Sequence, residues 1–572
     1  MSDSTPREGL DRRRFLQVLG VTGAGAAVVS GCSTQKVEKL IPYLVQSEDQ
    51  VPGLATWYAG TCTECSAGCG LHVRTREGRA IKLEGNPEHP VNAGKLCAQG
   101  QSALQGLYNP DRLTGPKARQ ADGSFKDLTW DDAIALLVQK LQGAGGKLAV
   151  INGAGRGTFS DLLAAWTAAQ GGKVVAYQPF SAEPIRQASQ QVFGLNEVPV
   201  YDFARAKYIV SFGADFLDGA WVSPVETQLG FAEAHGFKNG EMAKHVSFSP
   251  RMALTGMNAD EWLAPRPGSE AAIVLAMANL LLSERSGNPA DANALRGALA
   301  AFTPEKAQEA SGINAEVIKR VAREFASASP SLAVAGGIPA QHRGAAELCA
   351  AVHLLNYIAG NVGTTVRYGA DQDAGGDGYA ALLALVEGFA GGATSVAIVH
   401  EANPAYAMPK KADFAGKFAK VPFKVSTSLY LDETAALCDL LLPNLHALER
   451  WDDARSRKGV SNLLQPVMEP VFPGMATGDL LLKTAQKLGG PLAAFSAPSY
   501  EAHLKAQWLK VVGSEDAWRA ALAKGGVYGD APATPVKLAA GAAGAVAFSA
   551  PAFDGPEGED AFWLMQIGRA HV

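Results

Sequence analysis

The sequence has no excess of positive charge and no clear membrane-spanning segment. It contains 51 Lys and Arg against 56 Asp and Glu, so its formal net charge is −5. This balance gives no basic surface for gripping nucleic acid, and we expect no nucleic-acid partner. Apart from one ambiguous stretch near the N-terminus, no apolar run reaches the roughly 20 residues that span a bilayer. A hydrophobic content of 47% with 19% charged residues excludes a disordered chain.

The usual catalytic signatures are also absent. The ten histidines show no metal-ligand spacing, and no Ser/His/Asp set or carboxylate pair stands out. We expect His342 and His446 to be solvated or structural, and Cys349 and Cys438 to be inert core residues. Residues 450–458 are rich in charge and are interpreted as a solvated loop.

The N-terminus is typical of an export signal. Residues 11–16 contain paired arginines, including Arg12 and Arg13, and an uncharged stretch rich in Gly, Ala and Val covers residues 18–31. This pattern predicts a twin-arginine (Tat) signal, with a short amphipathic helix of the folded domain as the alternative. Residues 29–32 resemble a lipobox ending at Cys32. We therefore expect the protein to be periplasmic or at the extracytoplasmic face of the membrane.

Only seven cysteines are present, yet four of them lie within 36 positions. Cys62, Cys65, Cys69 and Cys97 follow the spacing C-x2-C-x3-C-x27-C. Thiolates suit iron–sulfur clusters, and a [4Fe–4S] cube needs four of them converging on one point. Residues 71–74 and 80–83 alternate like two strands of a hairpin, which would bring the chain back so that the fourth cysteine joins the first three.

Two other uses of these cysteines remain open. A structural zinc site also takes four thiolates, although it usually comes as two C-x2-C pairs, and this spacing is asymmetric. Two disulfides would suit an exported protein, but Cys62 and Cys65 are awkwardly close for separate bridges. The pattern favours the cluster.

Together these features resemble a known family. The export signal, the cysteine spacing and residues 84–87 and 94–97 resemble the molybdopterin oxidoreductases of the dimethyl-sulfoxide-reductase superfamily. More narrowly, residues 37–43 and 106–113 resemble the B subunit of alternative complex III, a membrane-bound quinol-oxidising respiratory assembly. The resemblance implies partners among the other subunits of such a complex, namely haem c and quinol-oxidising membrane subunits.

Beyond residue 125 the pattern alternates strand and helix, which predicts a multi-domain α/β fold with parallel sheets. Buried strands are expected at 147–152, 207–212, 245–249, 332–335, 396–399 and 423–426, with a helix at 158–170 after a glycine-rich turn. With the resemblance, the expected organisation is an export signal at 1–32, a β-rich 4Fe–4S domain at 33–124, a discontinuous α/β domain at 125–180 and 335–490, a second α/β domain at 181–334, and a linker with the start of a truncated C-terminal domain at 491–572.

The resemblance also implies a site for molybdenum bis-molybdopterin guanine dinucleotide. The positions that match the family's motifs are Ser181 as a molybdenum ligand, Arg251, Asp260 and Glu270. Ser181 is equally well explained as a helix N-cap. Three departures weaken this inheritance: Asp215 stands in a would-be phosphate loop, Glu270 replaces Asp, and Gln99 replaces a basic residue after the fourth cysteine. Together they favour a protein that keeps the family's fold but has lost its pterin cofactor.

Three functions follow. The first is an exported iron–sulfur electron-transfer and scaffold subunit of a quinol-oxidising complex, without molybdenum. The second is an active molybdenum bis-pterin oxidoreductase, and the third is a cofactor-free interaction subunit. Residues 530–560 are expected to be a linker, and 566–572 look unlike natural protein, so we expect a chain that is truncated at its C-terminus.

Overall fold

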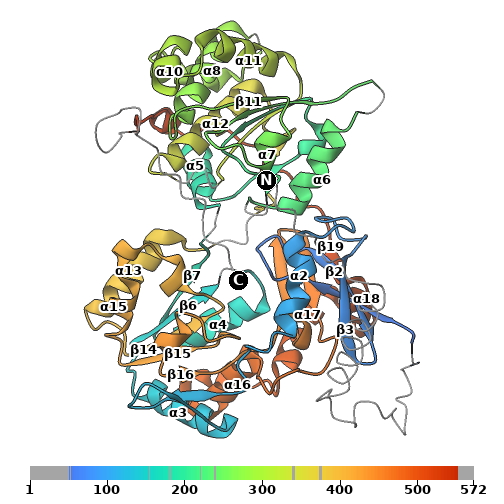
Figure 1. Cartoon of the computed structure of the whole chain (residues 1–572), viewed down its shortest axis with the longest axis vertical. Coiled ribbons are helices and arrows are strands. Elements are labelled where there is room, and N and C mark those ends of the chain that lie inside the picture. The colour runs from blue at the N-terminus through green and yellow to red at the C-terminus, as the bar shows by residue number, and fades with distance from the viewer. Residues whose placement is uncertain are drawn as a thin grey trace, which may run out of the picture. The chain divides into compact units, whose positions relative to one another are not determined.

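The computed structural model divides the chain into two units, Met1–Leu54 and Ala55–Val572. The residues that the structure describes are 51, 53–153, 155–179, 182–218, 221–237, 240–285, 287–337, 342–372 and 376–551. The predicted export signal, the Cys32 lipobox, Ser181 and the expected chain end at 552–572 lie outside these residues. The fold below is that of the second unit (Figure 1).

A small antiparallel sheet carries the first cysteines. Its strands β1 (Thr56–Thr61), β2 (Gly70–Arg76) and β3 (Arg79–Gly85) pair in the order β1-β2-β3, and helix α2 (Ala98–Leu107) follows. The β2–β3 turn consists of Glu77 and Gly78, both with positive φ, which matches the right-handed twist of a tight hairpin. The hairpin predicted from residues 71–74 and 80–83 is confirmed.

A seven-stranded sheet forms the first α/β body, in the order β5-β4-β16-β15-β14-β6-β7. Its central and β7-side pairs are parallel, and only the pairs β16–β4 and β4–β5 are antiparallel. The strands are β4 (Lys117–Arg119), β5 (Phe125–Asp127), β6 (Leu148–Gly153), β7 (Lys173–Tyr177), β14 (Val396–His400), β15 (Phe423–Ser426) and β16 (Leu440–Leu441).

Helices cover both faces of this sheet because its strands are apolar on both sides. In β6, Leu148 and Val150 pack into one core cluster, whereas Ala149 and Ile151 pack into another. The first cluster also holds residues of α3 (Trp130–Gln142), α4 (Thr158–Ala169) and α16 (Thr477–Leu488). The second holds residues of α13 (Gly378–Ala390) and α15 (Phe414–Phe418).

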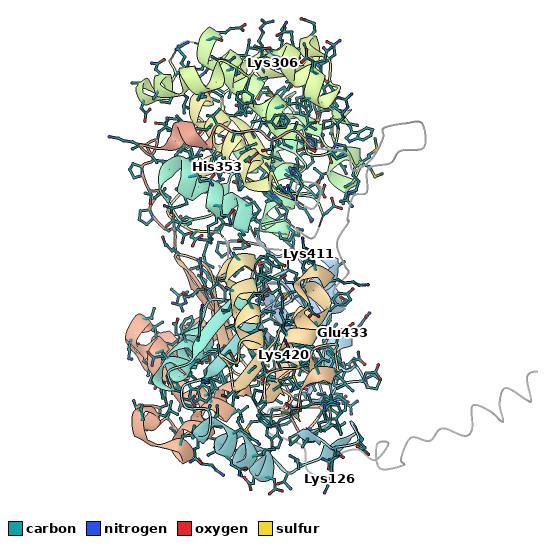
Figure 2. All side chains as sticks on the ribbon, turned by 90° about the vertical axis from the view of Figure 1, so that its left-hand side faces the viewer. Lys126, Lys306, His353, Lys411, Lys420 and Glu433 are labelled. Carbon is teal, nitrogen blue, oxygen red and sulfur yellow. The ribbon has the colours of Figure 1, made fainter. Side chains whose placement is uncertain are left out.

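A four-stranded parallel sheet forms the second α/β body. Its strands β9 (Tyr208–Phe212), β10 (Lys244–Phe248), β11 (Glu261–Leu263) and β12 (Ser331–Ala335) are ordered β11-β10-β9-β12. His353 of this body (Figure 2) is buried, and its ring contacts Phe193 and Tyr368 of the core. The surrounding helices are α5 (Glu183–Phe193), α6 (Pro224–His235), α7 (Leu254–Met257), α8 (Glu270–Glu284), α9 (Arg296–Leu299), α10 (Pro304–Ser311), α11 (Ala315–Ser327) and α12 (Ala345–Ala359). A short antiparallel pair joins β8 (Val200–Tyr201) to β13 (Val366–Arg367).

The interpretation of residues 450–458 as a solvated loop is wrong. They contribute strand β17 (Asp452–Arg457), which pairs with β18 (Val460–Leu464), and β18 pairs with β19 (Gly526–Tyr528). Arg450 is only 8% exposed, and its guanidinium pairs with Glu401 from another segment and with Asp452 of β17. Helices α17 (Tyr500–Val512) and α18 (Glu515–Lys524) lie between β18 and β19 in the chain.

The predicted buried strands and parallel sheets are confirmed, as is a helix at 158–169. The described part of the expected linker is not a free tether: Thr534 and Ala539 bond the backbones of Tyr368 and Val192, and Phe548 packs on the second body's core. Among the described residues, no helix combines the length and apolar character needed to cross a membrane.

Candidate metal centre and dinucleotide sites

The four cysteines lie at the ends of elements that meet at one place. Cys62 follows β1, Cys65 lies in the turn after it, Cys69 precedes β2, and Cys97 is the N-cap residue of α2. The backbone N–H of Cys62 donates to the carbonyl of Cys69 at 2.8 Å, which closes the loop 62–69. All four belong to one apolar cluster, in which Cys62 and Cys69 are buried and the other two are partly buried.

Asn92 fixes the end of this loop. Its side-chain oxygen accepts from the N–H of Gly70 at 2.9 Å, and its amide nitrogen donates to the carbonyls of Gly70 and Lys95. Gly85 packs directly on the backbone of Gly94 and Lys95, where a Cβ atom would collide. The segment that carries Cys97 is therefore held against the segment that carries Cys69.

The thiols are near enough to influence one another. Burial raises the pKa of Cys62, Cys65 and Cys69, and neighbouring thiols, including Cys97 for two of them, add to the rise. Several thiolates gathered in a buried site need compensating positive charge, which bound metal supplies. The donor set therefore fits a thiolate-ligated metal group.

The structure bears on the two alternatives for these cysteines. All six described cysteines are free thiols, which contradicts the disulfide alternative. Within the described part of the chain, no three His, Cys, Asp or Glu side chains are placed to hold a metal ion. Thiolates on one zinc ion all lie about 2.3 Å from it, whereas each thiolate of a cube binds a different iron and the sulfurs are spread more widely. It is the asymmetric spacing of the cysteines in the sequence that favours a cluster over zinc.

Residues from the far end of the chain also hold the cysteine loop. Ser456 Oγ and Asn462 Nδ2 donate to the carbonyl of Gly68 at 3.1 and 3.0 Å, and Asn462 Oδ1 contacts His89 Nε2 at 2.9 Å. Sequence reasoning missed these residues, because Gly68 and Asn462 are 394 positions apart and no local pattern links them.

The residues predicted for a pterin site do not all come together. Arg251 follows the carboxyl end of β10, and Glu270 starts α8 after the carboxyl end of β11. Asp260 lies at the opposite, amino edge of the same parallel sheet, where its carboxylate accepts from the N–H of His245 at 2.7 Å. Asp260 therefore does not share a site with Arg251. Gln99 is exposed on α2.

Glu270 is fully buried and has no well-formed hydrogen bond to either carboxylate oxygen. Burial raises its pKa to about 7, against the opposing effect of the backbone N–H groups of Glu270 and Gly268. His342 Nε2, also unpaired, is 3.9 Å away. The carboxylate of Glu270 would suit a ligand with hydrogen-bond donors, and Arg251 Nε is likewise buried without a partner.

Open α/β sheets bind ligands where the strand order reverses, outside the carboxyl ends of the strands. In the four-stranded sheet this point lies between β9 and β12. There, a Cβ atom on Gly337 would be 2.5 Å from the carbonyl oxygen of Gly213, so the two backbones touch. Beside them Arg251 Nη2 pairs with Asp215 Oδ2 at 2.7 Å. The positive charge of Arg251, which would attract a phosphate, is therefore already balanced by Asp215.

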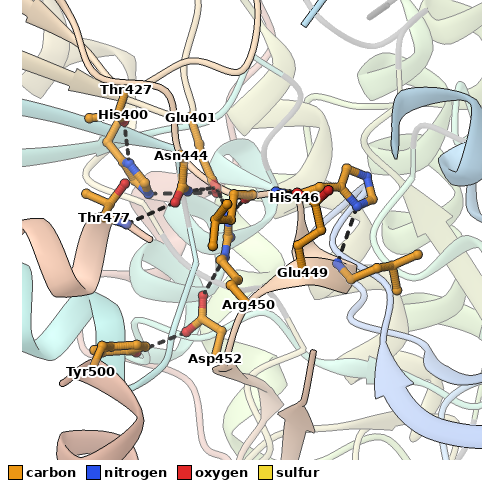
Figure 3. Close-up of polar contacts among 12 residues, drawn as sticks. His400, Glu401, Thr427, Asn444, His446, Glu449, Arg450, Asp452, Thr477 and Tyr500 are labelled. Atoms are coloured by element: carbon orange, nitrogen blue, oxygen red, sulfur yellow. Dashed lines mark hydrogen bonds and ion pairs between the residues drawn. The ribbon is translucent and has the colours of Figure 1, made fainter. Parts of the chain in front are cut away.

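The seven-stranded sheet repeats this arrangement between β6 and β14. A Cβ atom on Gly153 would overlap the carbonyl oxygen of Glu401, and Arg450 Nη1 pairs with Glu401 Oε1 at 2.7 Å. Arg450 Nε lies 3.5 Å from Asp452, which accepts from the hydroxyl of Tyr500 (Figure 3). Although burial acts to raise it, Arg450 and His400 hold the pKa of Glu401 at about 2.

Polar neighbours complete this network. Asn444 bonds Glu401 and the N–H of Thr477, and His400 Nδ1 contacts Thr427 (Figure 3). Nearby, Glu449 forms a buried bidentate ion pair with Arg112.

Comparison with known proteins agrees with this architecture. Residues 55–109 match the molybdopterin oxidoreductase Fe4S4 domain, and residues 112–474 match the molybdopterin oxidoreductase domain. The chain is 32% identical to the menaquinone reductase molybdopterin-binding-like subunit of Nitratidesulfovibrio vulgaris, covering 87% of this chain and 74% of that one. It is 25% identical to the thiosulfate reductase molybdopterin-containing subunit of Salmonella typhimurium, covering 84% and 69%.

A solved structure shares the fold. Acetylene hydratase from Pelobacter acetylenicus superposes with a TM-score of 0.65 at 17% identity, over 77% of this chain and 70% of that chain. The multi-domain α/β architecture with its parallel sheets and small β-rich cysteine region is thus that of such proteins. The chain belongs to the molybdopterin oxidoreductase family and contains that family's Fe4S4 domain.

Proposed function

We propose that this protein is an electron-transfer and scaffold subunit of a membrane-associated quinol-oxidising respiratory complex, with one [4Fe–4S] cluster and no molybdenum. Cys62, Cys65, Cys69 and Cys97 would hold the cluster. When bound, it carries one electron at a time between partner centres. The chain's own part is to bury the sulfurs, exclude water from most of the site, and fix the loop through Asn92.

The proposal that molybdenum is absent depends on two ion pairs, one at each place where the strand order reverses. In the pairs Asp215–Arg251 and Glu401–Arg450, a carboxylate of this chain lies beside the arginine at each of these two places. A phosphate entering either place would meet a like charge as well as touching backbones. The residues present do not fit a bis-dinucleotide cofactor at these points.

The likeness to a menaquinone reductase subunit supports the membrane-complex part of the proposal. That relative is described as molybdopterin-binding-like, and it covers most of this chain. The twin-arginine pattern of residues 11–16 supports assembly at the extracytoplasmic face, together with haem c and quinol-oxidising membrane subunits.

A second function is an active molybdenum oxidoreductase, and Glu270 favours it. Its buried carboxylate, unpaired and 3.9 Å from His342, would suit the hydrogen-bond donors of a guanine. Ser181 would then be the metal ligand.

Metal analysis decides between these functions. The protein is purified anaerobically, iron, sulfide and molybdenum are measured by mass spectrometry and colorimetry, and the dithionite-reduced sample is examined by low-temperature EPR. We expect iron and sulfide in equal amounts, an EPR signal of a reduced cubane, and no molybdenum. Stoichiometric molybdenum would establish the second function, and a protein without iron would contradict both.

A further inference from the structure

The hairpin β17–β18 hydrogen-bonds the cysteine loop, residues 62–69, at Gly68. Ser456 and Asn462 both donate to its carbonyl oxygen, and Asn462 also donates to Ser456 Oγ at 2.7 Å. Ser456 and Asn462 are 5% and 0% exposed, so water does not compete for these bonds. Gly68 has φ +57°, and a Cβ atom there would overlap Ser456 Oγ, so the contact requires glycine. The hairpin is therefore rigidly attached to the residue that precedes Cys69.

The next residue on β17 brings a charge to this place. Arg457 Nη1 pairs with Oε1 of Glu226, on α6, at 2.6 Å. The other carboxylate oxygen of Glu226 accepts from Gln372 Nε2 at 2.6 Å. The side chains of Arg457 and Glu226 are only 14% and 18% exposed, so solvent screens them weakly.

Both charges reach the surroundings of the sulfurs. Val225, the residue before Glu226 on α6, packs in the same apolar cluster as the four cysteines. Burial lowers the pKa of His89, the partner of Asn462, with Arg457 lowering it further and Glu226 raising it. The ion pair thus lies beside the cysteine loop, and its two members act in opposite directions.

Reduction of a cluster adds one negative charge at the sulfur site. A nearby carboxylate disfavours that added charge and a nearby guanidinium favours it, so the reduction potential depends on both. Because Glu226 and Arg457 carry opposite charges and neutralise each other, removing either one leaves the other charge uncompensated near the cluster.

We propose that Glu226 and Arg457 form a tuning pair, in which each charge offsets the other's effect on the reduction potential of the cluster held by Cys62, Cys65, Cys69 and Cys97. This rests on the proposed function, because it requires the cluster. Neither residue is one of the four cysteine ligands, so both act through the electrostatic field.

The test is a redox titration of the purified, iron-loaded protein, followed by EPR. Glu226→Gln should raise the midpoint potential, and Arg457→Gln should lower it. The double variant should return close to the wild-type potential, and Arg457→Lys, which keeps the charge, should stay close to it. The matched control is Glu284→Gln, which removes the carboxylate of the exposed ion pair between Glu284 of α8 and Arg323 of α11 and should leave the potential unchanged.

The outcomes separate this inference from the proposed function. Absence of iron in the wild-type protein overturns the proposed function. Iron present with unchanged potentials in both single variants overturns the tuning pair. Shifts of the same sign in both variants also overturn it, because a purely structural disturbance has no reason to follow the sign of the removed charge. Should one single variant fail to fold, the other and Arg457→Lys still decide the matter.

Discussion

The carboxylate of Asp453 caps the first turn of α4. Its Oδ1 accepts the N–H of Thr158 at 2.5 Å, and its Oδ2 accepts the Thr158 hydroxyl at 2.7 Å and the indole N–H of Trp508 at 2.8 Å. The glycine-rich turn before α4 could have offered its helix N-terminus to a phosphate. Instead, a side chain from β17 occupies it.

Replacing Asp453 by Ala should lower the free energy of unfolding by on the order of 2 kcal/mol, because a helix cap is lost and the Trp508 N–H is left unpaired. Asp453→Asn should cost less, since the one oxygen of asparagine can still cap the helix, although its NH2 group cannot accept from the Trp508 N–H. Urea denaturation followed by circular dichroism measures both. The control is Asp161→Ala in the same first turn, where the ion pair with Arg455 is largely exposed and worth under about 1 kcal/mol. Equal losses in the Asp453 and Asp161 variants would contradict the capping role.

How much of this structure the sequence predicts depends on how local each interaction is. The strands at 148–153 and 396–400 were predictable because they are short, continuous apolar runs that pack on both faces of a sheet. The charged segment that forms β17 was not. Its arginines pair with Asp161, Glu226 and Glu401, which lie far away in the chain, so the segment looks solvated when only its own residues are considered.

The same division holds at the site. The four cysteines were predictable because their spacing is short and the intervening hairpin has its own turn signal at Glu77 and Gly78. Asn462, which bonds the cysteine loop, carries no local signal. Asp260 was assigned by motif order alone, and the structure puts it at the amino edge of its sheet, because it precedes β11 rather than following β10 directly.

The raised pKa of Glu270 should make the stability of the protein depend on pH. Its pKa in the folded protein is about 7, above its ordinary value of 4.5. Between these pH values the folded state holds the proton more tightly than the unfolded chain. The contribution of Glu270 to the free energy of unfolding is therefore full below pH 4.5 and is lost as the pH rises through 7. Glu270→Gln, which mimics the protonated form, should therefore be more stable than wild type at pH 8, by on the order of 3 kcal/mol.

Urea titrations at pH 5 and pH 8 measure this effect. The two proteins should be similar at pH 5 and differ at pH 8. Glu316→Gln, at an exposed position on α11, is the control and should show no such divergence. A Glu270→Gln variant that is less stable than wild type at pH 8 would mean that the carboxylate has a stabilising partner.

Loss of one cysteine should abolish the cluster without unfolding the protein. Cys65→Ser removes a partly buried thiolate ligand, so the brown colour, the iron content and the EPR signal should all be lost. The control is Cys438→Ser, at a fully buried position where the thiol donates to the carbonyl of Thr434 and a hydroxyl can do the same. It should keep its iron. An unchanged EPR signal in Cys65→Ser would remove Cys65 from the ligand set.

The closed strand-order reversal in the seven-stranded sheet makes Gly153 sensitive to a single methyl group. A Cβ atom there would overlap the carbonyl oxygen of Glu401, and a backbone carbonyl cannot turn aside as a flexible side chain can. Gly153→Ala should therefore push the end of β6 away from Glu401, the first residue after β14, and lower the free energy of unfolding by about 1–3 kcal/mol. It should also loosen the Glu401–Arg450 ion pair. Gly155→Ala is the matched control, because a Cβ atom at Gly155 would have nothing within 4 Å. If Gly153→Ala were as stable as Gly155→Ala, the two backbones would have room between them, and this place would not be closed to a dinucleotide.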